Sequence, residues 1–285
     1  MKTFPVSLII SFYNKIDYLK LIFAALERQS FRDFEVIIAD DGSKPEVVEE
    51  IRQIMEHAPL TIQHLWHEDQ GFRKTMIFNE AIRKSRSPYL IFMDGDCVPH
   101  SRFVEEHYKN RQPNVLLAGR RVYLSEKLSK SLDPEKIKDG YLEKVGFIIT
   151  LLADGIFGRS SHVVKGIYVG NPLLRKFLNR AMKGVLGSNF SVHKSDLEAI
   201  NGFDERYEAP AVGEDSDIEL RLVWNNVEIR MVKNMAVQYH IHHKKLPRPQ
   251  KNLEIFEAVK KEGQAFTPYG LVQPDNRDTN YVQKG

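Results

Sequence analysis

Two pairs of acidic side chains follow apolar runs in the first hundred residues. Asp94-Gly95-Asp96 comes directly after the apolar residues 89–93, and Asp40-Asp41 ends the run that begins at residue 34. Carboxylates as close as Asp94 and Asp96 repel each other, so a bound divalent cation is the simplest reason to keep them together. We therefore expect a metal site that handles an anionic group, such as a phosphate or diphosphate.

The apolar runs are typical of buried parallel strands, because both of their faces are hydrophobic. Strands are predicted at residues 6–11, 34–41 and 60–66 and from residue 89, and helices at residues 17–29, from Pro45 and at residues 71–85. This alternation predicts an α/β fold with a Rossmann-like, mostly parallel sheet flanked by helices. Ligands of such sheets bind at the carboxyl ends of the strands, where the acids fall.

The second half of the chain is less regular. Strands are predicted at residues 115–124, 187–192 and 229–239, and helices at residues 125–145, from Ser195, from Gly213 to about residue 226 and at residues 251–262. Gly213-Glu214-Asp215 opens one of these helices. Three histidines, His240, His242 and His243, follow the last strand.

Composition excludes some function classes. The chain has 285 residues, and 41 Lys and Arg against 38 Asp and Glu give a net charge of +3, which argues against a general nucleic-acid binder. The single cysteine, Cys97, excludes an internal disulfide and fits a reducing compartment. With no signal-peptide pattern and no membrane-spanning run, we expect a cytoplasmic protein, soluble or peripheral on the inner face of the cytoplasmic membrane.

Seven short motifs occur in an order that resembles the inverting glycosyltransferases of family 2, which have the GT-A fold. They are SLIISFYN at residues 7–14, DDGS at 40–43, DQGFR at 69–73 with Asn79, DGD at 94–96, GSN at 187–189, GFD at 202–204 and GED at 213–215. Each motif is weak alone, but seven motifs in the order found in the family make the resemblance specific. The resemblance extends from about residue 4 to residue 243. The GFR and GED elements are most similar to the chondroitin-polymerase-type branch, whose members use UDP-sugars.

The resemblance implies a nucleotide site in the first half of the chain. Asp41 would accept a hydrogen bond from the uracil N3–H, and Phe12 would lie near the base. Arg73 and Asn79 would help to hold the nucleotide. Asp94 would contact the ribose or the waters of the metal.

The resemblance also implies a metal site for Mn²⁺ or Mg²⁺. Asp96 would ligate the cation, and His240 would complete the site, since a histidine stands at this place in the chondroitin-polymerase-type branch. His242 is the alternative ligand, because alternate residues of a strand share a face. Carboxylate and imidazole ligands together suit Mn²⁺, and a cation stabilises the charge that develops on a diphosphate leaving group.

For catalysis, the family places the base at the Asp of the GED motif, here Asp215. Inversion by single displacement needs a base that takes the proton of the acceptor hydroxyl as it attacks the anomeric carbon. Glu214 and Asn189 would bind the acceptor or the donor sugar. A plain alternative is that these acids only complement the positive end of a helix.

The implied function is transfer of a sugar from a nucleotide-sugar, with UDP as the expected nucleotide, to a hydroxyl of a glycan or glycolipid such as lipopolysaccharide or capsular polysaccharide. Residues 1–100 would bind the nucleotide-sugar and residues 101–246 the acceptor, followed by a C-terminal helix and tail at residues 247–285. A phosphatase of the HAD type using Asp94 and Asp96, and a non-catalytic sugar-nucleotide-binding module, are the alternatives.

One basic segment stands apart from the family motifs. Residues 155–195 hold seven Lys and Arg and no Asp or Glu, and residues 172–186 form an amphipathic pattern in which Arg175, Lys176, Arg180 and Lys183 share the polar face. A basic amphipathic helix can lie on an anionic membrane surface. It can equally pack on the core with a solvated basic face.

Overall fold

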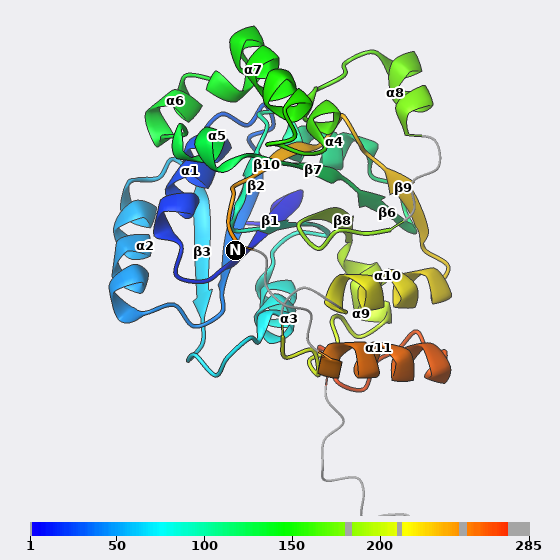
Figure 1. Cartoon of the computed structure of the whole chain (residues 1–285). Coiled ribbons are helices and arrows are strands. Elements are labelled where there is room, and N and C mark those ends of the chain that lie inside the picture. Colours follow the sequence, from blue (N-terminus) through cyan, green and yellow to red (C-terminus); the bar gives the residue numbers. More distant parts are fainter. Residues whose placement is uncertain (1, 180–183, 210–212, 245–249, 273–285) are drawn as a thin grey trace, which may run out of the picture.

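The computed structural model describes residues 2–179, 184–209, 213–244 and 250–272. Its centre is a seven-stranded sheet with the strand order β3-β2-β1-β4-β8-β6-β9 (Figure 1). The strands of this sheet are β1 (Val6–Phe12), β2 (Phe34–Asp40), β3 (Thr61–Trp66), β4 (Tyr89–Asp94), β6 (Val115–Ala118), β8 (Asn189–His193) and β9 (Glu228–Met231). Strand β8 runs antiparallel to β4 and β6, and the other neighbouring strands run parallel.

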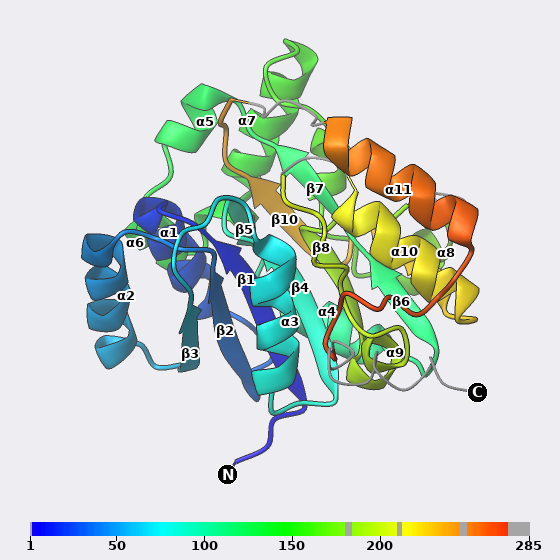
Figure 2. The ribbon, with the colours of Figure 1, turned by 90° about the horizontal axis from the view of Figure 1, so that it is seen from below.

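Helices cover both faces of this sheet, which is why its strands are apolar on both sides. In β1, Leu8 and Ile10 pack with one face, where α1 (Ile16–Leu26), α2 (Pro45–His57) and α4 (Phe103–Asn110) lie. Ile9 packs with the opposite face, which is covered by α3 (Lys74–Lys84), α9 (Lys194–Ala199) and α10 (Glu214–Trp224). Figure 2 shows α3 and α10 lying over the same face, with α11 (Gln250–Glu262) beside α10.

A second, smaller sheet stands at the carboxyl edge of the first. It joins β5 (Cys97–Pro99), β10 (Val237–His240) and β7 (Arg120–Tyr123) in that order. Its apolar residues pack against a group of helices at the top of Figure 1. These are α5 (Glu126–Lys130), α6 (Pro134–Lys138) and α7 (Val145–Ile156), with the short 3₁₀ turns η1 (Tyr141–Glu143) and η2 (Val163–Gly166). Helix α8 (Pro172–Leu178) follows in the chain, and none of its residues is buried.

Several predicted elements need correction. The strand predicted at residues 115–124 is two strands, because Gly119 lies against the Asn189 side chain and the chain passes there from one sheet to the other. The strand predicted at residues 229–239 is likewise divided into β9 and β10. Helix α3 begins at Lys74, three residues later than predicted, because Gly71 has φ +81° and the residues next to it are still in a loop. Helix α7 had no predicted counterpart.

Within the described residues, the basic amphipathic pattern predicted over residues 172–186 is helical over α8, Pro172–Leu178. Arg180 and Lys183 lie outside the described residues. In the described parts of the chain, no helix is both long and apolar enough to cross a bilayer.

Candidate active site

The carboxyl ends of neighbouring parallel strands meet at one edge of the main sheet and carry the predicted acids. Phe12 of β1 pairs with Asp40 of β2, and Ser11 pairs with Asp94 of β4. The register therefore places both acidic motifs beside the end of β1, as expected for a ligand site in an open α/β sheet.

Asp96 contacts two histidines from a distant part of the chain. One oxygen of Asp96 lies 3.4 Å from Nε2 of His240 and 2.9 Å from Nε2 of His243, and the two nitrogens are 3.2 Å apart. Burial raises the pKa of Asp96, but the hydrogen bonds from both imidazoles outweigh it and hold this pKa well below its usual range. The hydrogen bond to Asp96 in turn raises the pKa of His243.

These three side chains fit a divalent cation. One ligand atom from each of them lies within 4.8 Å of the others. A carboxylate oxygen with two imidazole nitrogens is a mixed ligand set that suits Mn²⁺ and related ions. Asp96, His240 and His243 are therefore the residues that would hold the metal.

The small sheet explains why the two histidines reach Asp96. His240 pairs with Cys97 across the antiparallel strands β10 and β5, and the N–H of Ile241 donates to the Asp96 carbonyl, 2.9 Å away. Strand β10 ends at His240, so alternation no longer applies beyond it. The irregular segment that follows brings His243 to Asp96, whereas His242 is exposed and donates its N–H to Ser129. Sequence reasoning missed His243 because it extended the strand.

Asp94 is surrounded by cations rather than by the histidines. One of its oxygens accepts from Nζ of Lys74 at 2.8 Å and from Ser11, and the other accepts from Arg121 at 3.3 Å. Neither Lys74 nor Arg121 was predicted as a site residue. The only signal for Lys74 was its place directly after Arg73 in the GFR motif.

Lys74 links Asp94 to the start of helix α10. Its Nζ lies 3.7 Å from a Glu214 oxygen, and only 12% of its side chain is exposed. Burial alone would lower the pKa of Lys74, but Asp94, Glu214 and Asp215 raise it above its usual value. Lys74 is therefore a fixed positive charge between the two acidic motifs.

Glu214 and Asp215 occupy the first turn of α10, where helix geometry favours carboxylates. Gly213 precedes them with φ +113°, and a Cβ there would lie 2.4 Å from the Tyr207 ring. Asp215 accepts a hydrogen bond of 3.3 Å from the N–H of Gly187 in the GSN motif. Burial raises the pKa of Glu214, against the opposing charge of Lys74.

Asp41 lies on the other side of the β1 end. Its carboxylate accepts the backbone N–H of Arg73 at 2.9 Å and faces Nε2 of His67 at 2.8 Å. Burial raises the pKa of Asp41 although both partners lower it. The Arg73 side chain points instead toward Glu208, 3.7 Å away.

A pocket of about 680 Å³ opens between β3 and α3, next to the Asp41–His67 pair. This volume lies in the range typical of small-molecule sites. Its described lining residues come from β3 and the loop after it, from α3 and from the C-terminal segment; they include His64, Trp66, His67, Met76, Glu80, Arg83 and Leu271.

Three predicted site residues are buried in structural roles. Phe12 is 3% exposed and packs in the core between β1 and α1. The Asn79 amide bonds to both the N–H and the carbonyl of Phe203. The Asn189 amide bonds to the Arg120 and Ala236 carbonyls and to His107. The Asn79 and Asn189 side chains are thus held by other partners, whereas the Phe12 ring lies beside Gly95 of the DGD motif, 3.5 Å from where a Cβ would stand there.

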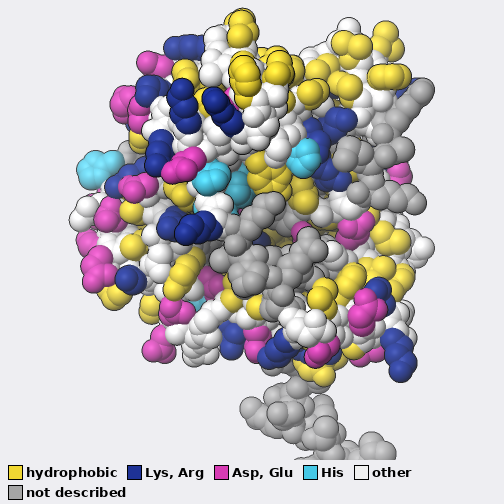
Figure 3. Space-filling view, in the orientation of Figure 1, with side chains coloured by type: hydrophobic (Ala, Val, Ile, Leu, Met, Phe, Trp, Pro, Cys, Tyr) yellow, Lys and Arg dark blue, Asp and Glu magenta, His cyan; other side chains and the backbone are white. Residues whose placement is uncertain are grey.

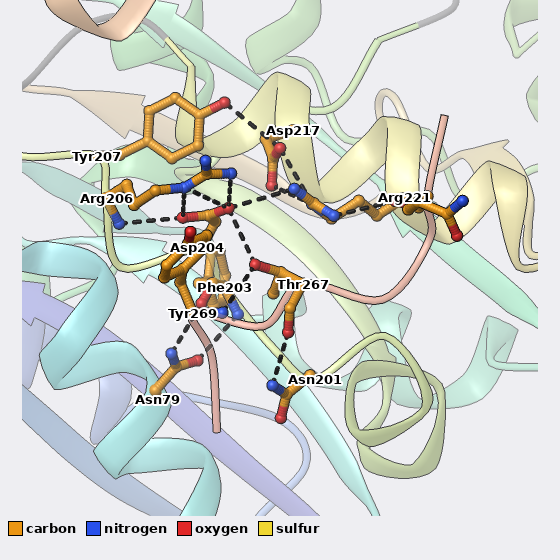
Figure 4. A network of polar contacts seen from close by, with 11 residues as sticks. Asn79, Asn201, Phe203, Asp204, Arg206, Tyr207, Asp217, Arg221, Thr267 and Tyr269 are labelled. Atoms are coloured by element: carbon orange, nitrogen blue, oxygen red, sulfur yellow. Dashed lines mark hydrogen bonds and ion pairs between the residues drawn. The ribbon is translucent and has the colours of Figure 1, made fainter. Parts of the chain in front are cut away.

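The GFD motif belongs to a polar network that fixes the start of α10 (Figure 4). Asp204 accepts from Arg206, from Arg221 of α10 and from Thr267 of the C-terminal segment. Arg221 also pairs with Asp217, 2.9 Å away. The motif therefore positions Glu214 and Asp215 rather than contributing its own carboxylate to the site.

Comparisons with known proteins identify related families and structures. Residues 7–156 match the family described as glycosyl transferase family 2, and residues 175–244 match one described as the N-terminal domain of galactosyltransferase. The chain is 26% identical to a chondroitin synthase of Escherichia coli over 82% of this chain and 34% of that protein. It is also 26% identical to the uncharacterized glycosyltransferase YfnE of Bacillus subtilis, over 83% of this chain and 64% of that protein.

The fold is shared with solved structures at lower identity. TarS of S. aureus superposes with a TM-score of 0.56 and 15% identity, covering 90% of this chain and 39% of that chain. The mannosyltransferase PcManGT of Pyrobaculum calidifontis, solved with GDP-Man and Mn²⁺, gives a TM-score of 0.55 and 13% identity over 92% of this chain and 70% of that chain.

The chain thus spans about a third of the length of the chondroitin synthase that it matches. The expected GT-A architecture, a mostly parallel sheet flanked by helices, is confirmed. Because the matched region covers more than half of the sequence, this chain belongs to glycosyl transferase family 2.

Proposed function

We propose that this protein is a metal-dependent, inverting glycosyltransferase that moves a sugar from a nucleotide-sugar to a hydroxyl of a glycan or glycolipid. The observation that carries the proposal is the meeting of Asp96, His240 and His243, which lies beside Asp94 and is linked through Lys74 to the helix that bears Asp215. Family membership supports the same reaction class.

The donor diphosphate would lie at the Asp94–Asp96 edge. A divalent cation held there, Mn²⁺ or Mg²⁺, would supply positive charge to the leaving diphosphate. Lys74 and Arg121 are the cationic side chains of the chain itself at this edge, and both are now paired with Asp94. They orient Asp94 and offset its charge when the anionic donor arrives.

The nucleotide is proposed to be UDP. Asp41 stands at the strand end beside a pocket of suitable size, and the chondroitin-polymerase-type resemblance assigns it to the uracil N3–H. Its present partners, His67 and the Arg73 N–H, hold the carboxylate in place. Asn79 and Phe12 are buried and support, from the core, the elements that carry Asp41 and Arg73.

Asp215 is proposed as the base. Its carboxylate takes the proton of the acceptor hydroxyl as the hydroxyl oxygen attacks the anomeric carbon. The bond from that carbon to the diphosphate oxygen breaks, and the bonding electrons leave with the nucleoside diphosphate, so the configuration inverts. Glu214 is proposed to bind the acceptor, and Asn189 helps to hold strand β8 through its hydrogen bonds to the Arg120 and Ala236 carbonyls. Similarity to chondroitin synthases supports a polysaccharide acceptor. Capsular polysaccharide and lipopolysaccharide are the acceptors proposed.

The test is a nucleoside diphosphate release assay over a panel of UDP- and GDP-sugars, with Mn²⁺ and with EDTA. Thermal-shift measurements report donor binding in parallel, since a ligand of the native state raises the melting temperature. We expect one UDP-sugar to stabilise the protein and to release UDP only with the metal. Phosphate release from a generic phosphomonoester without UDP release would favour the phosphatase instead, and donor binding with no turnover on any acceptor would favour a binding module.

A further inference from the structure

Exposed apolar side chains gather on one part of the surface, over the helices that cover the small sheet. Of the sixteen large hydrophobic residues that are exposed in the described chain, eight fall within residues 145–177. They are Val145, Ile149, Ile156, Phe157, Val164, Leu173, Leu174 and Phe177. We call these eight residues the apolar ridge. Figure 3 shows hydrophobic atoms at the top of the molecule, over α7 and α8.

The two helices of the ridge turn their apolar faces to solvent. Helix α7 buries Phe147 and Leu151 against the small sheet and leaves Ile149 and Ile156 exposed. Helix α8 buries no residue, and Leu173 is 80% exposed. It is tied to the protein by its polar side, through the ion pair of Arg175 with Glu106. An apolar face of this extent on a folded chain marks an interaction surface.

Exposed cations flank the ridge, and the adjacent acid Glu143 is paired with Arg28. Lys144, Arg159 and Lys176 are exposed beside it, and Arg159 lies over the Phe157 ring with 5.5 Å between guanidinium and ring centre. Residues 155–195 contain no Asp or Glu at all. Pairing with a second copy of the chain would set these cations against one another. A bilayer with anionic headgroups complements them and also accepts the apolar side chains.

We propose that the apolar ridge docks this protein on an anionic membrane surface, with α7 and α8 lying in the headgroup region. The bound helices bury Ile149, Ile156, Leu173 and Phe177 among the lipids, and Lys144, Arg159 and Lys176 pair with lipid phosphates. This surface differs from the one proposed from the sequence: it begins at Val145, ten residues before the basic segment, and α8 presents its apolar face outward.

The ridge adjoins the candidate active site. Tyr123 pairs with Ser161 in the loop between α7 and η2, and its ring lies 5.0 Å from that of His240 and 5.6 Å from that of His162. A docked enzyme would thus hold the metal site close to the lipid surface. If the proposed glycosyl transfer is right, the acceptor is a glycan carried on a membrane lipid; the docking itself does not depend on the reaction.

The experiment is co-sedimentation of the full chain with vesicles of phosphatidylglycerol and phosphatidylethanolamine, and with vesicles of phosphatidylcholine alone. We expect binding to the anionic vesicles that weakens with added salt. The double variant Ile156→Ser/Leu173→Ser should bind at least tenfold more weakly. The control Val223→Ser/Val272→Ser, at exposed apolar positions outside the ridge, should bind as the wild type does.

A second variant, Lys144→Gln/Arg159→Gln/Lys176→Gln, tests the charge. Each lost cation should weaken binding on the order of fivefold, and only on anionic vesicles. Circular dichroism confirms that each variant is folded. The proposal is overturned if the wild type stays in the supernatant, if the ridge variant binds as well as the control, or if the ridge mediates concentration-dependent dimers in analytical ultracentrifugation without vesicle binding. Release of UDP is not measured, so this outcome is independent of the proposed reaction.

Discussion

Asp96 is held between two imidazoles, and this contact defines the proposed metal site at the scale of single residues. Asp96 and His240 were predicted from motif order, whereas His243 was not. The reason is that alternation along a strand favours His242, and only the structure shows that β10 ends at His240. Lys74 was not predicted either, because no pattern in the sequence indicates which lysine of a helix contacts two acids that are distant in the chain.

Replacing His243 tests whether His243 or His242 is the second histidine ligand of the proposed metal site. The change His243→Ala removes one of three ligand atoms, so the affinity for Mn²⁺, measured by calorimetry, should fall more than tenfold. His242→Ala is the matched control: this side chain is exposed, lies one position away and is outside the cluster. Equal Mn²⁺ affinity in the two variants would contradict the assignment.

Lys74→Met removes the positive charge between Asp94 and Glu214. Two largely buried carboxylates would then face each other, and breaking such a pairing destabilises a protein by about 3 kcal/mol. We expect this loss in the free energy of unfolding from urea titration. Lys84→Met, in the same helix, is the control, because the Lys84 side chain is 58% exposed and its pair with Glu80 contributes less than about 1 kcal/mol. Similar losses in both variants would show that Lys74 has no special role.

At the scale of elements, the site depends on where strands end and how closely they approach. The parallel βα units were predictable because β1, β2 and β4 are apolar on both faces and their helices are amphipathic. The division of residues 115–124 and of residues 229–239 between two sheets was not predictable from the sequence. Both segments are continuous in hydrophobicity, and their breaks come from contacts such as Gly119 against Asn189, which join residues distant in sequence.

Gly95 lies where the backbones of β1 and the DGD motif nearly touch. A Cβ on Gly95 would lie 2.5 Å from the Ser11 carbonyl oxygen, so the backbone must shift and move Asp94 and Asp96 with it. Gly95→Ala should therefore weaken Mn²⁺ binding and lower the melting temperature. Gly146→Ala in α7 is the control, since a Cβ there meets no atom within 4 Å and alanine favours a helix. If Gly95→Ala melts and binds Mn²⁺ as the wild type does, this close approach has no consequence.

His107 of helix α4 is a neutral histidine that hydrogen-bonds to Ser191 and Asn189 of strand β8. Burial lowers the pKa of His107 to about 4, against a hydrogen bond to Asn189 that raises it. Its stabilising contribution is complete above the unfolded value of about 6.5 and is lost as the pH falls toward 4, by up to about 3 kcal/mol. In denaturant titrations between pH 7 and pH 4, the free energy of unfolding of His107→Gln should depend less on pH than that of the wild type. The same dependence in both proteins would contradict the assignment.

At the scale of the whole molecule, residues 1–100 and 101–246, to which the sequence assigned separate functions, share the main sheet. Strand β8 of the second half pairs with β4 of the first, and the metal residues come from both. Family membership and the order of acids were readable from the sequence because they are local. The apolar ridge was readable only in part. Residues 172–186 were predicted to be amphipathic, but α7 was not predicted, and the exposure of the apolar face of α8 depends on what surrounds it.

The most direct test of the proposed reaction is the turnover of Asp215→Asn beside that of Ser216→Ala, its exposed neighbour. Asparagine keeps the size of the side chain but cannot accept the acceptor proton. With the UDP-sugar found in the donor screen, Mn²⁺ and an acceptor, we predict that Asp215→Asn binds donor normally and transfers sugar at least a hundredfold more slowly. Ser216→Ala should transfer at nearly the wild-type rate. Full transfer by Asp215→Asn would contradict the proposed base.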